Sequence, residues 1–111
     1  MRYFSWVLLL ALLAGNGIGA TLENTTITLL MIDKNHGNKI FIKTSIPHAK
    51  GTPSCHTSDW DFVMPYDDQL DKAMFALLLA SNTTQKPVTL YGTGTCAIRP
   101  DIETLQRTEA R

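Results

Sequence analysis

Three histidines and a group of acidic residues are the side chains of this chain best suited to holding a metal ion. The histidines are His36, His48 and His56, and no two stand three or four residues apart, the spacing that aligns ligands on one helix face. We therefore interpret them as solvated loop residues. The acidic residues are Asp59, Asp61, Asp67, Asp68 and Asp71. Their Asp-X-Asp pattern lacks the glycine and terminal glutamate of a calcium loop, so we expect no metal and no cofactor.

Hydrolytic chemistry would need a nucleophile beside a base. Ser54, His56, Ser58 and Asp59 supply the residue types, but side chains so close together in one extended segment cannot converge on one point. The chain has no G-x-S-x-G motif. A Gly-Thr-Gly turn at residues 92–94 lacks the third glycine and the following helix of a phosphate-binding loop. We expect no catalytic residues and no enzyme activity.

The two cysteines, Cys55 and Cys96, are the remaining reactive side chains. A metal site would need more ligands at short spacing, and the neighbouring His56 would point away from Cys55 in a strand. An even number of cysteines in an exported chain instead predicts one disulfide. Closing a loop of this length should stabilise the fold by about 4 kcal/mol.

Length and charge limit the class of protein. The chain has 111 residues, with 10 Lys and Arg against 10 Asp and Glu, so it lacks the excess of basic residues that nucleic-acid binding needs. Residues 1–20 join a basic start to an apolar block and a small-residue end, which indicates a signal peptide cleaved after Gly19 or Ala20. The block is too short to span a bilayer. We expect a single secreted or periplasmic domain over residues 21–111, with no membrane span after cleavage.

The elements follow from residue pattern. Residues 26–32 alternate as a strand with Ile27, Leu29 and Met31 on one face, and residues 39–44 complete a hairpin. Residues 45–54 form a loop and residues 55–64 are extended. A helix over about residues 68–81, capped by Asp68, is apolar around most of its circumference, so we expect it to be buried. Further extended segments are expected at residues 88–91 and 96–98, with residues 102–105 less clear and 106–111 frayed.

This order predicts an α+β fold, with a small, mostly antiparallel sheet, one buried helix and one disulfide. An OB-like open barrel is the specific candidate.

Three amphipathic aromatic residues are candidates for ligand contact, namely Trp60, Tyr66 and Tyr91. Such side chains stack on sugars or anchor protein interfaces. Trp60 alternates with Phe62 and Met64, which favours a core position for it. Tyr91 is the better candidate for exposure.

Several segments carry a resemblance. They are Gly51-Thr-Pro-Ser-Cys55, Trp60, Ala76-Leu-Leu-Leu-Ala80, Lys86-Pro-Val-Thr-Leu-Tyr91 and the Gly-Thr-Gly-Thr-Cys turn at residues 92–96. In this order they resemble small exported bacterial single-disulfide proteins and the OB-fold B subunit of subtilase cytotoxin and its pertussis-like relatives. Those B subunits form pentameric rings that bind cell-surface glycans, and the resemblance implies their fold more than their function. No glycan-site residue of that family has a match here.

We therefore expect a non-enzymatic exported binding module that recognises a glycan or an envelope protein, with homo-oligomer formation open. The alternative is a periplasmic inhibitor of a hydrolase such as lysozyme, which would act through residues 45–54 or 92–95.

Overall fold

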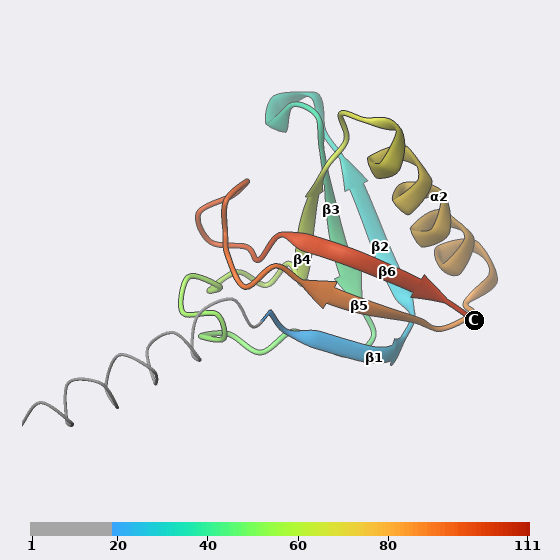
Figure 1. Ribbon diagram of the computed structural model, residues 1–111, viewed down its shortest axis with the longest axis horizontal. Helices are drawn as coiled ribbons and strands as arrows, with labels where there is room; N and C mark the ends of the chain where they lie inside the picture. The colour runs from blue at the N-terminus through green and yellow to red at the C-terminus, as the bar shows by residue number, and fades with distance from the viewer. Residues whose placement is uncertain (1–18) are drawn as a thin grey trace, which may run out of the picture.

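The computed structural model describes residues 19–111, so the expected signal peptide lies almost wholly outside the described residues. The elements are β1 (Thr21–Thr25), β2 (Ile27–Ile32), the 3-10 turn η1 (Lys34–His36), β3 (Lys39–Thr44), β4 (Phe62–Pro65), α2 (Gln69–Thr84), β5 (Val88–Gly92) and β6 (Leu105–Ala110). They confirm the α+β class (Figure 1). Among residues 19–111, no helix has both the length and the apolar character needed to cross a membrane.

The strands form two three-stranded antiparallel sheets, where the sequence predicted one. Sheet A has the order β1-β5-β6 and sheet B the order β2-β3-β4. The chain passes from β1 to β2 through Thr26, and a single parallel bridge between Val63 and Thr104 links the sheets again. The predicted hairpin is β2 with β3, in a register that pairs Leu30 with Ile42.

The predicted face of the first strand is wrong because the β2–β3 register shifts between Ile27 and Leu29. After this irregularity, Leu30 instead of Leu29 packs beside Ile27 against the core. Leu29 is 45% exposed. An extra residue in one strand turns every following side chain to the other face.

The main core lies between the sheets and α2, and its buried members are Leu22, Ile27, Ile40, Ile42, Phe62, Met64, Leu78, Val88, Leu90 and Leu105. A second, smaller cluster joins Phe41, Val63 and Ile102, with Trp60 packed against it. Trp60 therefore does not share a face with Phe62 and Met64, because residues 55–61 are irregular instead of extended.

Helix α2 begins as predicted but ends later and is less buried. The Asp68 side chain accepts from the Asp71 N–H, which with the reciprocal contact makes a capping box. The helix ends at Thr84, followed by Gln85 in the left-handed conformation, instead of at residues 81–82. Only Leu78 and Ser81 are buried, because α2 packs on β2 and β6 with one face and nothing covers the other within the described residues. The expected burial of this helix is wrong.

Both ends of the described chain contribute strands that the sequence did not predict. β1 precedes the first predicted strand, and residues expected to fray form β6, which pairs with β5 along its length. Residues 96–98, expected to be extended, are irregular. The composition of residues 106–111 does not predict a strand. Residues 105–110 form one because they pair with β5.

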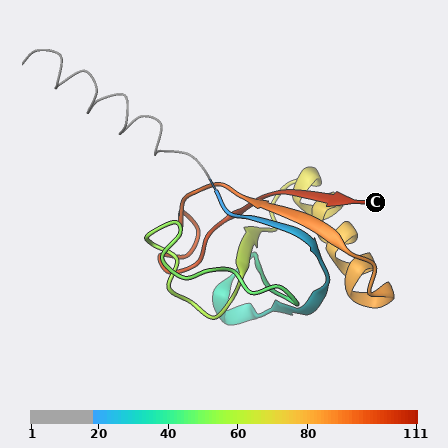
Figure 2. The same ribbon diagram turned by 90° about the horizontal axis from the view of Figure 1, so that it is seen from below.

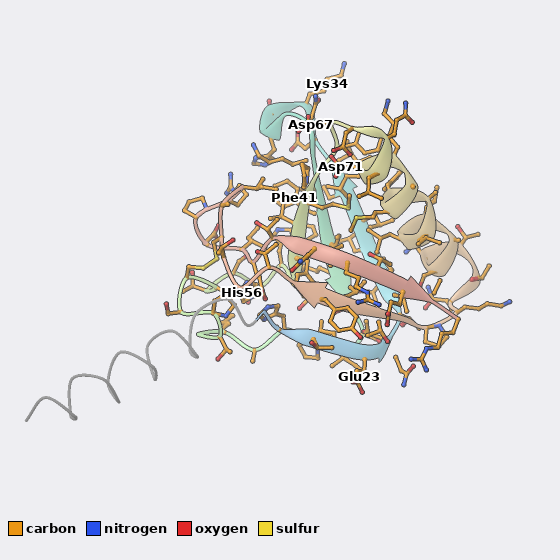
Figure 3. All side chains as sticks on the ribbon, in the orientation of Figure 1. Glu23, Lys34, Phe41, His56, Asp67 and Asp71 are labelled. Carbon is orange, nitrogen blue, oxygen red and sulfur yellow. A yellow bond between two sulfur atoms is a disulfide. The ribbon has the colours of Figure 1, made fainter. Side chains whose placement is uncertain are left out.

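The long loops gather at the end of the molecule opposite α2 (Figures 1 and 2). They are residues 45–61, whose first part matches the predicted loop, and residues 93–104. Figure 3 shows His56 among these loops and Asp71 at the start of α2.

Candidate functional site

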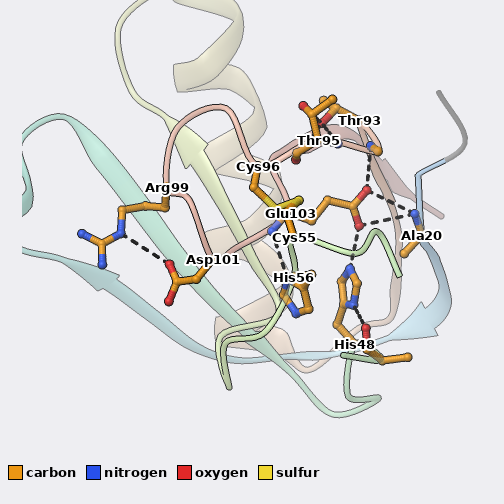
Figure 4. Close-up of a disulfide and its surroundings, with 12 residues drawn as sticks. Ala20, His48, Cys55, His56, Thr93, Thr95, Cys96, Arg99, Asp101 and Glu103 are labelled. Carbon is orange, nitrogen blue, oxygen red and sulfur yellow. Dashed lines mark hydrogen bonds and ion pairs between the residues drawn. A yellow bond between two sulfur atoms is a disulfide. The ribbon is translucent and has the colours of Figure 1, made fainter. Parts of the chain in front are cut away.

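The predicted disulfide between Cys55 and Cys96 is confirmed, with the two Cα atoms 6.1 Å apart. It joins the loop before β4 to the loop after β5 (Figure 4). Beside it lies a buried polar cluster, which we define as His48, His56, Asp61 and Glu103.

His48 bridges two acceptors. Its Nδ1 lies 2.8 Å from the Ala49 carbonyl oxygen and its Nε2 lies 2.6 Å from Glu103 Oε1. A carbonyl oxygen only accepts, so Nδ1 carries a proton. The Nε2 bond is made between side chains that are both 0% exposed, and a buried polar side chain requires such a partner.

The carboxylate of Glu103 is hydrogen-bonded to groups from three segments of the chain. Besides His48, its Oε2 accepts from the Gly94 N–H at 2.7 Å, and the Ala20 N–H lies 3.2 Å from Oε2 and 3.4 Å from Oε1. These donors provide hydrogen-bond partners for both oxygens of the buried carboxylate. Glu103 thus ties the start of the described chain, the 45–54 loop and the 93–104 loop together.

His56 lies against His48 with ring centroids 3.7 Å apart. Its Nδ1 accepts from the Glu103 N–H at 3.0 Å, so the neutral ring carries its proton on Nε2, which is buried without a partner. Burial, and next the neighbouring His48, lower the pKa of His56. The prediction of solvated histidines is wrong for His48 and His56. His36, the last residue of η1, is partly exposed and lies near Asp33, the residue that caps η1.

Asp61, one of the candidate metal-binding acidic residues, accepts hydrogen bonds from two backbone N–H groups. Its Oδ1 accepts from the His48 N–H and its Oδ2 from the Thr44 N–H, each at 2.8 Å. The carboxylate therefore holds the start of the 45–54 loop to the end of β3.

The buried polar cluster holds the 45–61 and 93–104 loops in place. Its histidine nitrogens are all buried, and a general base must reach the proton that it abstracts. In the part of the chain that the structure describes, no three His, Cys, Asp or Glu side chains are grouped to hold a metal ion. The sequence could not reveal this cluster, because its members are up to 55 residues apart.

The three aromatic candidates do not converge. Trp60 packs on Phe41, with centroids 5.6 Å apart, in the second cluster. Tyr66 packs edge-on against Phe75 from α2. Tyr91, on β5, is partly exposed: its hydroxyl donates to Glu109 and the Arg107 guanidinium lies 5.1 Å from its ring centre.

A further surface feature is the outer side of α2. Five of its exposed residues, Leu70, Ala73, Leu77, Ala80 and Thr84, follow a three-four spacing, and we call them the α2 stripe. Leu70 is 69% and Leu77 39% exposed. A shallow pocket at the C-terminal end of the stripe is lined in part by Leu77, Pro87 and Arg111. The sequence predicted the four apolar residues of the stripe to lie on a buried helix, and Thr84 to lie beyond its end.

Comparison of the chain with protein-family models, with curated proteins and with solved structures gave no match. The resemblance to exported single-disulfide proteins and toxin B subunits therefore stays a prediction.

Proposed function

We propose that this chain is a non-enzymatic exported binding module that associates through the α2 stripe. The signal-like start and the disulfide support export to a secreted or periplasmic location. The observation that carries the proposal is the exposure of the stripe. A helix that is apolar on all sides is ordinarily buried, and a contiguous exposed apolar face marks a contact surface.

The occupant that fits the stripe best is a second copy of the chain. In an antiparallel pair of α2 helices, Leu70 of each copy meets Ala80 of the other, and Ala73 meets Leu77. Each large side chain then faces a small one, and each contact occurs twice, as two-fold symmetry requires. The three-four spacing is also that of helices which pack along a seam.

Charge supports the same arrangement. The N-terminal end of α2 carries the exposed Asp67 and Asp68, whereas its C-terminal end adjoins the exposed Lys86 and Arg111. Antiparallel pairing brings the acidic end of one helix to the basic end of the other. A helix pair buries less than a standard interface of roughly 1,600 Å², so we expect a reversible dimer.

Sedimentation of the mature protein over a wide range of concentration tests this proposal. We expect a dimer for wild type and for Leu79→Lys, a control on the same helix but outside the stripe, where Leu79 is 45% exposed. Leu77→Lys should be monomeric with an unchanged circular dichroism spectrum. A wild-type monomer at every concentration would overturn self-association.

Pull-down with envelope extracts distinguishes the other partners. If a monomeric wild type captures an envelope protein and Leu77→Lys does not, that protein replaces the second copy as the occupant. If wild type and Leu77→Lys inhibit a lysozyme-type hydrolase equally, the loops at 45–54 or 92–95 contact the hydrolase and the stripe does not.

Glycan recognition is a second candidate, favoured by the environment of Tyr91. A partly exposed ring flanked by a carboxylate and a guanidinium combines stacking with hydrogen bonding. A glycan array should show binding by wild type and by Tyr91→Phe, and loss of binding by Tyr91→Ala. Absence of binding by wild type would reject this candidate.

An OB-like barrel is likewise a proposal. The direct passage from β1 to β2 and the Val63–Thr104 bridge support it. Slow exchange of the Val63 amide hydrogen, which donates to Glu103 O, is expected if the sheets are joined there; exchange at the rate of a loop would argue against it.

A further inference from the structure

We propose that the mature chain begins at Ala20 and that its new α-ammonium group sits on the buried carboxylate of Glu103. This inference rests on the export part of the proposed function, and goes beyond it by assigning a processing site and a role for the amine that processing creates.

Ala20 is an integral part of the fold. Its carbonyl oxygen accepts from the Gly92 N–H at 2.8 Å, and its nitrogen lies 3.2 and 3.4 Å from the two oxygens of Glu103 (Figure 4). Cleavage after Ala20 would remove both contacts and leave the buried Gly92 N–H without its acceptor. Unpaired buried donors are costly, so the structure favours a cut before Ala20.

The position before Ala20 has no room for a side chain. A Cβ atom on Gly19 would lie 1.8 Å from the Gly92 carbonyl oxygen and 2.8 Å from Glu103 Oε2. Only glycine fits there in the uncleaved chain. A small residue directly before the cut is also what a signal-peptide cleavage site requires.

The neighbouring sequence agrees with this cut. With cleavage after Gly19, glycines stand at the first and third positions before the cut, residues 19 and 17. With cleavage after Ala20, Ile18 would occupy the third position, where a small residue is preferred.

The charges around Glu103 give the amine its role. Two buried carboxylates, Glu103 and Asp61, face this region, whereas His48 is the one ring here with both nitrogens on acceptors and His56 is held neutral. A cation at Ala20 places a positive charge directly beside the Glu103 carboxylate. Its three N–H groups serve both Glu103 oxygens, whereas the single N–H of a peptide must be divided between them.

Export of the full chain from a bacterial host, followed by the mass and N-terminal sequence of the product, tests the cut. We expect Ala20 as the first residue. A product cleaved at a different position overturns the inference but leaves export intact, whereas an uncleaved product that begins at Met1 contradicts export itself.

The pairing of the ammonium group with Glu103 is tested on protein that starts at Ala20. Acetylation of its amine, or restoration of Gly19 in front of it, should lower the Tm by roughly 5 °C or more. Both differences should vanish in Glu103→Gln and persist in the control Glu109→Gln, whose carboxylate binds Tyr91 and Arg107 instead. Equal effects in the two backgrounds would overturn the pairing.

Amine reactivity provides a measurement on the wild-type protein in case Glu103→Gln does not fold. The Ala20 amine should react with an amine-specific reagent many times more slowly in the native protein than in urea. Equal rates in the two conditions would show that the amine is free in solution and would also overturn the pairing.

Discussion

The two buried histidines differ in what they give to the fold. His48 lies between two acceptors, whereas His56 accepts from a backbone N–H and is kept neutral by burial. Stacked rings at 3.7 Å would repel each other if both were charged. Because His56 is neutral, this repulsion between the stacked rings does not arise.

The lowered pKa of His56 predicts a pH dependence of stability. The ordinary pKa of a histidine, which His56 has in the unfolded chain, is about 6.5. In the folded protein the pKa of His56 is lower. Below about pH 6.5 the unfolded state therefore binds more protons than the folded state. The free energy of unfolding should therefore fall as pH is lowered from about 7 to about 5. Urea unfolding at several pH values measures the slope.

Two variants separate this effect from other titrating groups. His56→Gln should flatten the slope, while His36→Gln, at a partly exposed position, should retain it. The same slope in wild type and His56→Gln would assign the dependence to another residue.

The sequence could not predict this residue environment. Periodicity reports which face a strand or helix buries, and His48 and His56 lie in loops where no period exists. Their burial depends on Glu103, which arrives from a segment about fifty residues later. By contrast, the Cys55–Cys96 pairing follows from the cysteine count, because two cysteines allow only one intramolecular bond.

At the level of elements, local chemistry was the more reliable guide. The Asp68 cap of α2 was predictable because a capping box involves only residues within one turn. The exposure of the outer face of α2 was not predictable, because an apolar pattern does not say which side of the helix other elements cover. The shift in β2 was also beyond prediction, because residues 27–32 contain no glycine or proline to mark it.

Removal of the cap should weaken the helix. Asp68→Ala leaves the Asp71 N–H without its 2.8 Å acceptor and should lower the free energy of unfolding by about 1 kcal/mol. Asp67→Ala is the matched control, since that side chain only meets the exposed Asn38 amide at 3.4 Å. Urea unfolding should show the loss for Asp68→Ala alone; equal losses would mean that charge near the helix end, and not the cap, is responsible.

At the level of the molecule, the disulfide connects the 45–61 loop to the 93–104 loop, which also meet where Trp60 packs against the cluster that contains Ile102. Replacement of Cys55 and Cys96 by Ala should lower the Tm by about 10 °C or more, because the unfolded chain gains the entropy of a loop that was closed. Calorimetry of the purified protein measures this change. An unchanged Tm would mean that the bond does not form in solution.

The order of strands in sheet A also affects how the chain reaches this structure. β1 pairs Thr21 with Tyr91, whereas sheet B is built from neighbouring segments, so sheet B can form first and sheet A must await the end of the chain. An oxidised Cys55–Cys96 bond nearly halves the chain path from Thr21 to Tyr91. Because closure entropy grows with the logarithm of path length, oxidation should speed the closing of sheet A about twofold. Refolding rates with the bond intact and reduced would measure this kinetic effect.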